Sequence, residues 1–283
     1  MSPNPSAADA KRSSRRSGSA AFFDLDKTLM AGSSGIVWAR VSYDAGGISK
    51  RTMARWARDH LRYRLRGASD EAAAQVMAEV KELLSGTSAR DLRRMGPLVL
   101  AGVLPRIYPQ MLDEVHSHQD AGRATFIVSA AGVELVEMLA SVLGMDGGIG
   151  TRYAVDAEDR LTGELDGPFM YGAGKVEALE RYASEHGIDL SESFAYSDSA
   201  SDLPMLRAVG NPVVVNPDEE LARIARGEGW RVMRFEKLGR RLVVAGAALT
   251  ALALGGLGSV LAGRRSASGR VAGRNGRSTR LRR

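Results

Sequence analysis

The sequence predicts an α/β protein with a mostly parallel β-sheet covered by helices on both faces. From residue 121 onward, short apolar segments typical of buried strands alternate with helical segments, the pattern of a parallel sheet. One similar strand, at 20–25, comes first, and a long helical stretch over 36–120 separates it from the others. We therefore expect a core made of residues 20–35 and 121–237, with 36–120 inserted as an α-helical cap.

The composition is ordinary for a globular protein, with 44% apolar and 25% charged residues among 283. Of the net charge of +6, residues 1–20 contribute +3 and residues 264–283 contribute +8, so residues 21–263 carry −5. This acidic body argues against a fold that binds nucleic acid. The lack of cysteine excludes disulfides, thiolate nucleophiles and cysteine-based zinc sites, and it fits a reducing compartment such as the cytoplasm.

Both ends of the chain read as disordered basic tails. Residues 1–19 are rich in Ser, Pro, Ala and Arg and contain no apolar run, so they do not read as a secretory signal. Residues 264–283 contain eight arginines and no acidic residue.

The strand at 20–25 is followed by helical patterns with turn signals near 44–47, 66–69 and 84–88. A second buried strand is predicted at 125–132, and a helix that ends at Gly144 follows it. The remaining predictions are a hairpin over 149–165, helices at 174–187, 203–210 and from 217, and strands at 194–198, 212–215 and 231–235.

The first strand ends in "DLDKT", where Asp24 and Asp26 lie two residues apart and Thr28 follows. In an extended backbone both carboxylates leave on the same side, where like charges repel unless a cation compensates them. A hard ion such as Mg²⁺ suits carboxylate oxygens. The alternative is a strand that simply ends in a polar turn, and this motif alone does not decide between them.

Other polar residues follow the later strands. The second strand ends in "VSA", with Ser129 and Ala130, and the third ends in "YSDSASD", with Asp198 and Asp202, while Lys175 begins a helix between them. Singly, each reads as a cap, a turn residue or an exposed lysine. Since ligands of open α/β sheets gather at the carboxyl ends of the strands, their joint occurrence there favours one active site.

The motifs "DLDKT", "VSA", "GK" and "SDSASD", in this order, resemble those of the haloacid dehalogenase-like hydrolases. The insertion directly after the first motif is similar to that of the phosphoserine phosphatase-like branch. The resemblance covers about residues 20–235. It implies a Rossmann-like core, a helical cap, a Mg²⁺ requirement and phosphomonoester hydrolysis through an aspartyl-phosphate.

The resemblance also implies roles for single residues. Asp24 would be the nucleophile, and Asp26 would protonate the leaving alkoxide and later activate water. Mg²⁺ would be held by Asp24, the backbone carbonyl of Asp26 and Asp198, with Asp202 as a further ligand or as an outer partner that orients water. The phosphate group would be bound by Thr28, Ser129, the amide of Ala130 and Lys175.

Two positions depart from the phosphoserine phosphatase pattern. Those enzymes carry a glutamate nine residues after the nucleophile, which binds the substrate's ammonium group, and Ser33 stands there in this chain. Their last motif usually reads G-D-G-x-N-D, whereas Ser201 stands at the Asn position here. The chemistry survives both departures, but phosphoserine becomes a doubtful substrate.

Two further segments concern membranes. Five arginines between 51 and 66 recur at spacings of four, three, four and four, which places them on one helical face, either solvated or facing anionic lipid or phosphate. Residues 242–263 contain no charge and are long enough to cross a bilayer, so 240–263 reads as a membrane helix or as a helix docked on protein. His116 and His118 point to different sides of a helix, so we expect a helix end and no metal site there.

The sequence thus predicts a Mg²⁺-dependent phosphatase for a small phosphorylated substrate. One hypothesis is that this substrate is derived from a lipid. Its catalytic domain would be cytoplasmic and membrane-associated through 242–263, with no specific nucleic-acid partner. The alternatives are a soluble phosphoserine phosphatase and a catalytically silent, membrane-tethered scaffold with the same fold.

Overall fold

The computed structural model describes residues 18–49, 51, 77–78, 80–81 and 84–235. The described residues up to Met233 belong to one compact unit, and a second unit begins at Arg234. All the helices and strands below belong to the first unit.

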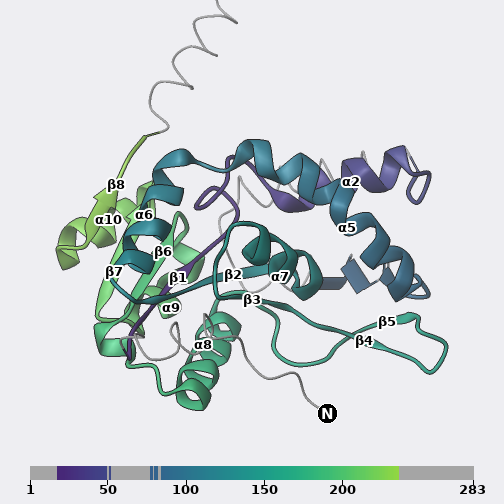
Figure 1. Ribbon diagram of the computed structural model, residues 1–283. Coiled ribbons are helices and arrows are strands. Elements are labelled where there is room, and N and C mark those ends of the chain that lie inside the picture. The colour runs from purple at the N-terminus through teal and green to yellow at the C-terminus, as the bar shows by residue number, and fades with distance from the viewer. Residues whose placement is uncertain (1–17, 50, 52–76, 79, 82–83, 236–283) are drawn as a thin grey trace, which may run out of the picture. The chain divides into compact units, whose positions relative to one another are not determined.

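The core is a six-stranded sheet with the order β3-β2-β1-β6-β7-β8 (Figure 1). Every neighbouring pair is parallel. The strands are β1 (Ala20–Phe23), β2 (Ala124–Gly132), β3 (Gly147–Thr151), β6 (Phe194–Ser197), β7 (Asn211–Val215) and β8 (Arg231–Met233). The chain builds one half of the sheet outward from β1 and then returns to β6 on its other side. Ligands of such sheets bind at this reversal point, outside the carboxyl ends of β1 and β6.

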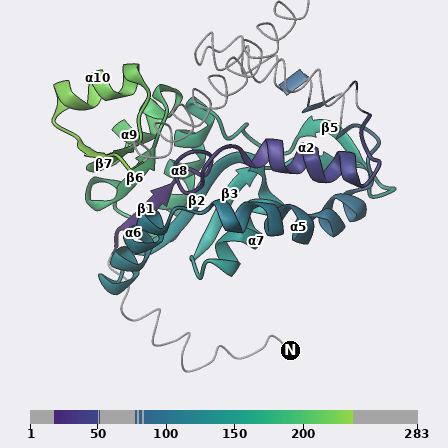
Figure 2. The ribbon, with the colours of Figure 1, turned by 90° about the horizontal axis from the view of Figure 1, so that it is seen from above.

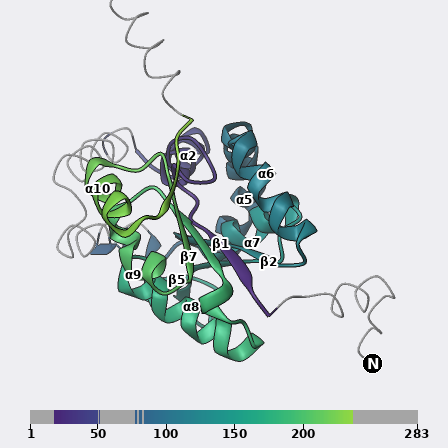
Figure 3. The same cartoon turned by 90° about the vertical axis from the view of Figure 1, so that its left-hand side faces the viewer.

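Helices cover both faces of the sheet, as predicted (Figure 3). The helices on one face are α8 (Ala173–His186), α9 (Leu203–Arg207) and α10 (Glu219–Glu228). Those on the other are α6 (Pro109–Asp120) and α7 (Val133–Val142). The short turns η2 (Leu190–Glu192) and η3 (Ala200–Asp202) precede β6 and α9.

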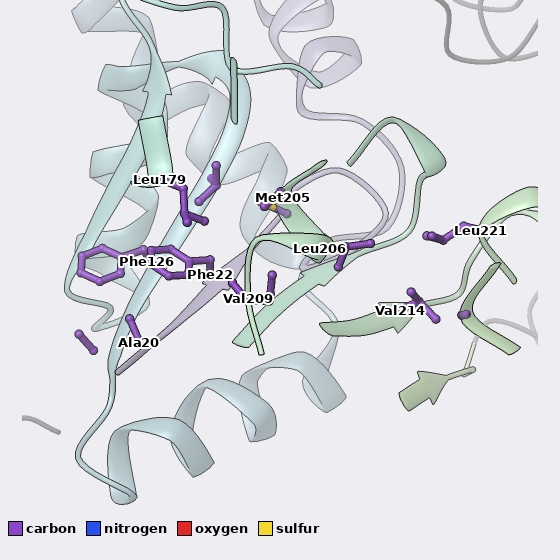
Figure 4. Close-up of a cluster of buried hydrophobic side chains, with 13 residues drawn as sticks. Ala20, Phe22, Phe126, Leu179, Met205, Leu206, Val209, Val214 and Leu221 are labelled. Atoms are coloured by element: carbon purple, nitrogen blue, oxygen red, sulfur yellow. The ribbon is translucent and has the colours of Figure 1, made fainter. Parts of the chain in front are cut away.

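Alternating side chains of β1 fill two separate layers of the core, because successive residues of a strand point to opposite faces. Phe22 stacks on Phe126 of β2, with ring centroids 5.6 Å apart, in the layer that also holds Leu179 of α8 and Met205 of α9 (Figure 4). Phe23 points to the α6 face, where its ring lies 6.0 Å from that of His118. Each such fully buried large side chain stabilises the fold by about 1.5–3 kcal/mol.

The described part of the predicted insertion contains α2 (Ser34–Asp44), α5 (Ala89–Val103) and η1 (Leu104–Arg106). Helices α2 and α5 lie side by side (Figure 2). Their close approach requires Gly102, because a Cβ atom there would lie 2.5 Å from Cγ1 of Val37.

Helix α6, which the sequence analysis assigns to the insertion, packs against the sheet instead. It contacts β1 and β2, and its Met111 and Val115 are fully buried. We therefore group α6 with the helices of the core, since its apolar side chains cover one face of β1 and β2.

The predicted hairpin at 149–165 is shorter in the structure. Residues Gly147–Thr151 join the parallel sheet as β3, and only β4 (Tyr153–Val155) and β5 (Leu161–Leu165) form an antiparallel pair. Leu161 of this hairpin packs with Leu84 and Ala89, so the hairpin shares a small apolar cluster with the helical insertion.

Several predictions concern residues outside the described ones: the tails at 1–17 and 264–283, the arginine stripe beyond Arg51, and the apolar segment 240–263. Among the residues that the structure describes, no helix combines the length and apolar character required to cross a bilayer.

Candidate active site

The carboxyl ends of β1 and β6 bring the first and third predicted motifs together. Phe23 pairs with Tyr196 in the sheet register, and the backbone N–H of Asp24 donates to the Tyr196 carbonyl over 3.0 Å. Asp24 is therefore held at the same edge as Asp198, which follows β6. Both carboxyl groups are buried.

Lys175 joins Asp24 to Asp202 across this edge. Its Nζ atom donates to Oδ1 of Asp24 over 2.6 Å and to Oδ2 of Asp202 over 2.8 Å. Only 4% of the lysine side chain is exposed, so the ammonium group depends on these two carboxylates. A lysine predicted from a short "GK" motif is thus the centre of a buried ion cluster.

Two glycines explain how a lysine in the first turn of α8 becomes buried. Gly172 adopts φ +52°, a conformation that glycine tolerates best. A Cβ atom on Gly174 would lie 1.9 Å from the carbonyl oxygen of Phe169, so any side chain there would displace the turn. The spacing in "GAGK" therefore brings the start of α8 close enough for Lys175 to reach Asp24.

Asp202 and Asp198 have further partners. Ser197 Oγ donates to Oδ2 of Asp202 over 2.7 Å, so that oxygen accepts two hydrogen bonds. Lys27 Nζ lies 3.4 Å from Oδ2 of Asp198, and the Lys27 side chain is 44% exposed. Lys27 adopts φ +61°, a strained conformation for a lysine that turns the chain sharply just after Asp26.

The cluster shifts the pKa values of its members. Burial raises the pKa of Asp24 to about 7, since the attraction of Lys175 only partly offsets desolvation and the negative charges of Asp202 and Asp198. Burial likewise raises the pKa of Asp198 to about 6, against the attraction of Lys27. Burial disfavours the charged form of Lys175, but Asp202 and Asp24 outweigh it and raise the lysine's pKa.

Asp26 lies in the turn after β1, and its side chain contacts the N-terminus of α2. Its Oδ2 accepts a hydrogen bond from Ser33 Oγ over 2.9 Å, and its Oδ1 accepts one from the backbone N–H of Ser34 over 2.8 Å. The side chain is partly exposed, unlike that of Asp24. The two acids that the sequence pairs therefore have different surroundings, which suits different chemical roles.

Besides Lys175 of α8, the predicted phosphate-binding residues lie at or just after the ends of the neighbouring strands β1 and β2. Ser129 and Ala130 lie in the last part of β2, where Ser129 Oγ accepts from the N–H of Ala131 over 3.2 Å. Thr28 is fully buried, and its hydroxyl has no hydrogen-bond partner among the described residues. A buried hydroxyl without a partner is costly and suggests a ligand atom as its partner.

The donor set fits a hard divalent cation. Three buried carboxylates, those of Asp24, Asp198 and Asp202, face two lysines. Burial raises the pKa values of Asp24 and Asp198, and the two lysines offset this only in part. Carboxylate oxygens are the ligands that Mg²⁺ prefers. In the described residues no three acidic or histidine side chains converge on one point, because Lys175 separates Asp24 from Asp202. The fit therefore rests on Asp24 and Asp198.

Three hydrogen bonds at the candidate site do not follow from the sequence pattern. The pattern did not predict that Lys27 would pair with Asp198, that Ser197 would bond Asp202, or that Ser33 would bond Asp26. The serine at 197 could have been found from its place in the strand-end motif. The other two depend on the sharp turn between β1 and α2.

Behind the site, a second buried polar group lies under α6. His118 Nδ1 accepts from Arg123 over 2.8 Å, and its Nε2 lies 2.8 Å from the hydroxyl of Tyr196. That hydroxyl donates to Glu114, which Arg231 also holds with two bonds. His116 is exposed, so the two histidines do lie on different sides of the helix.

Comparison with known proteins identifies relatives along most of the chain. Residues 21–207 match the family described as haloacid dehalogenase-like hydrolase. The chain is 36% identical over 219 residues to the "Inhibition of morphological differentiation protein" of Streptomyces azureus, which covers 77% of this chain and 79% of that one. It is 32% identical over 247 residues to the phosphoserine phosphatase SerB1 of Mycobacterium tuberculosis. The match covers 86% of this chain and 79% of that protein. A solved structure of a Bordetella pertussis protein of unknown function superposes with a TM-score of 0.65 at 30% identity, covering 76% of this chain and 97% of that one.

Proposed function

The chain belongs to the haloacid dehalogenase-like hydrolase family, on its phosphoserine phosphatase-like branch, and from this premise we propose that it hydrolyses phosphomonoesters with Asp24 as nucleophile and Asp26 as general acid and base. The observation that carries the proposal is the buried cluster in which Lys175 joins Asp24 to Asp202 at the reversal point of the sheet. Such a cluster is expensive to bury and has no evident structural purpose at a strand end.

In the first step, Asp24 Oδ attacks phosphorus, and an aspartyl-phosphate forms as the bond to the leaving oxygen breaks. Sheet hydrogen bonding fixes the backbone of Asp24, so the carboxylate needs little reorganisation before attack. The ammonium of Lys175 offsets negative charge on the phosphoryl oxygens and on Asp24, which would otherwise repel each other.

Asp26 would transfer protons to the leaving alkoxide and from the attacking water. As a carboxylic acid it protonates the leaving alkoxide, and as the resulting carboxylate it takes a proton from the water that hydrolyses the aspartyl-phosphate. Its partly exposed position supports this role, because the group must meet both an alcohol and water. Each cycle returns Asp26 to the acid form.

Thr28, Ser129 and the amide of Ala130 would bind the phosphoryl oxygens. The buried hydroxyl of Thr28, which has no partner in the described ranges of the chain, supports this assignment, since a ligand oxygen would satisfy it. Asp24, the carbonyl of Asp26 and Asp198 would hold Mg²⁺, with Asp202 as a further ligand or an outer partner. When bound, the ion supplies electrophilic stabilisation of the transferring phosphoryl group.

Phosphate release from 4-nitrophenyl phosphate with Mg²⁺, by the wild type and by Asp24→Asn, tests the proposal. The wild type should turn over, and Asp24→Asn should lose at least about a thousandfold in kcat/KM, because the first step has no substitute nucleophile. Equal, negligible rates for both proteins would favour the silent scaffold instead.

Two finer proposals concern substrate and location. The relative named phosphoserine phosphatase favours a small phosphorylated metabolite, and Ser33 in place of the ammonium-binding glutamate argues against phosphoserine itself. A panel of phosphorylated amino acids, sugars and glycerol phosphates on the purified protein would decide between them. Membrane association through 242–263 remains a prediction of the sequence alone, and deletion of 240–283 should turn a pelleting protein into one that stays in the supernatant.

A further inference from the structure

Helix α2 begins with an unusual exchange of capping partners. A serine at the N-cap ordinarily accepts a hydrogen bond from a backbone N–H of its own helix. Ser33 holds the N-cap position and accepts no such bond. Its hydroxyl instead donates to Oδ2 of Asp26 over 2.9 Å, while Oδ1 of Asp26 accepts from the N–H of Ser34. Asp26 thus caps the helix, and Ser33 holds Asp26.

The two partners of Asp26 differ in what they can do. A backbone N–H only donates, so Ser34 can bond only an acceptor oxygen of Asp26. A hydroxyl both donates and accepts, so Ser33 can donate to the carboxylate and, after rotation, accept from the carboxylic acid. A group that must carry a proton in one step and lose it in another needs such an adaptable partner.

The segment around this contact is well anchored. The N–H of Ala31 donates to the carbonyl of Arg106 over 2.8 Å, and Met30 bridges to Ile107. Ser34, which follows, is 2% exposed. The hydroxyl of Ser33 is therefore presented to Asp26 from a fixed backbone.

We infer that Ser33 is a positioning residue, whose hydroxyl orients the carboxyl group of Asp26 for proton transfer to the leaving group. The inference rests on the proposed function, because it refines the role given there to Asp26. It predicts a specific defect. Substrates that expel a poor leaving group need the proton, whereas a good leaving group departs with little help. Loss of the Ser33 hydroxyl should therefore harm esters of weakly acidic alcohols most.

The experiment compares kcat/KM for phenyl phosphate and 4-nitrophenyl phosphate, two substrates of similar shape whose leaving groups differ in acidity. General acid catalysis contributes about 10²–10⁴-fold, so misplacing the acid should remove part of that factor. For Ser33→Ala we expect about a tenfold loss with phenyl phosphate and less than about twofold with 4-nitrophenyl phosphate. Ser33→Thr keeps the hydroxyl and should restore the phenyl phosphate rate.

Ser117→Ala is the matched control, since Ser117 is exposed on α6 and its hydroxyl donates to the backbone carbonyl of Asp113. It should leave both rates unchanged. If thermal melting shows that Ser33→Ala is unfolded, Ser33→Gly supplies the same comparison, because glycine is tolerated at an N-cap. Equal losses with both substrates, or no loss, would overturn the inference while leaving the proposed function intact. A wild type inactive on both substrates would overturn the proposed function and the inference with it.

Discussion

The Nζ atom of Lys175 lies 2.6 Å from Oδ1 of Asp24, although 151 positions separate the two residues in the chain. Both side chains are buried, and the lysine also bonds Asp202. The contact joins the end of the first strand to the start of α8. It places a fixed positive charge beside the proposed nucleophile. The first prediction tests how much this contact contributes to stability and activity.

Replacing Lys175 by methionine should destabilise the protein and abolish activity. The substitution leaves Asp24 and Asp202 buried without their cation, and breaking a buried pair in this way costs about 3–5 kcal/mol. Urea unfolding without added metal measures the loss. Lys81→Met is the control, because Lys81 pairs with Glu164 on the surface and its loss should cost about 0–1 kcal/mol. Similar costs for both variants would contradict the buried cluster.

Replacing Thr28 by valine should leave the fold intact and weaken substrate binding. The Thr28 hydroxyl is buried and has no hydrogen-bond partner within the part of the chain that the structure describes, so removing it should be neutral or stabilise the protein by up to about 1 kcal/mol. KM for 4-nitrophenyl phosphate should rise if that hydroxyl binds a phosphoryl oxygen. Thr125→Val is the comparison, since Thr125 is equally buried but its hydroxyl contacts Gln119 and Asp146. That variant should lose about 1 kcal/mol of stability.

His118 should make a contribution to stability that is lost as the pH falls from about 6.5 to about 4, opposite in sign to the contribution of Asp24 and Asp198, whose raised pKa values favour the folded protein as the pH falls. Burial, together with the positive charge of the neighbouring Arg123, whose Nε–H donates to Nδ1, lowers the pKa of His118 to about 4. The unfolded chain therefore takes up a proton at His118 below about 6.5, whereas the folded protein does not until about 4, so protonation of His118 favours unfolding across that window.

Urea midpoints at pH 7 and pH 5 check this dependence on His118. His118→Gln should be less stable at pH 7, since it disturbs the bonds to Tyr196 and Arg123. On going from pH 7 to pH 5, however, its stability should change more favourably than that of the wild type, because the contribution of His118 is gone. His116→Gln should behave like the wild type, because His116 is exposed. Equal pH dependence in all three proteins would exclude His118 as the cause.

Mg²⁺ should raise the melting temperature of the wild type. A ligand at one hundred times its dissociation constant stabilises a folded protein by about 2.7 kcal/mol, and the buried carboxylates should bind the ion only when folded. Asp198→Asn should reduce the shift at least about twofold, because it removes one charged ligand from the set. Asp159→Asn changes an exposed turn residue that pairs with Arg93, and Mg²⁺ should raise its melting temperature as much as that of the wild type. An unchanged shift in Asp198→Asn would remove Asp198 from the metal site.

The amino-acid sequence by itself determined the α/β class, the parallel sheet and the strand ends that carry Asp24, Ser129 and Asp198. These features are local: each depends on a short apolar run and the polar residues that follow it, and parallel strands necessarily present their carboxyl ends at one edge. The signal for Lys175 was equally local, because the glycines of "GAGK" permit the tight turn before α8.

Only the tertiary structure decided which groups touch. The bond between Ser33 and Asp26 depends on the positive φ of Lys27, which no periodicity predicts. The pairing of His118 with Tyr196, 78 positions apart, required α6 to lie on the sheet rather than in the insertion. Hydrogen bonds and ion pairs are lost over a shift of about one ångström, whereas sequence patterns specify only which face of an element is buried. For this reason the pattern could propose candidate residues for the site, and only their packing could reveal their partners.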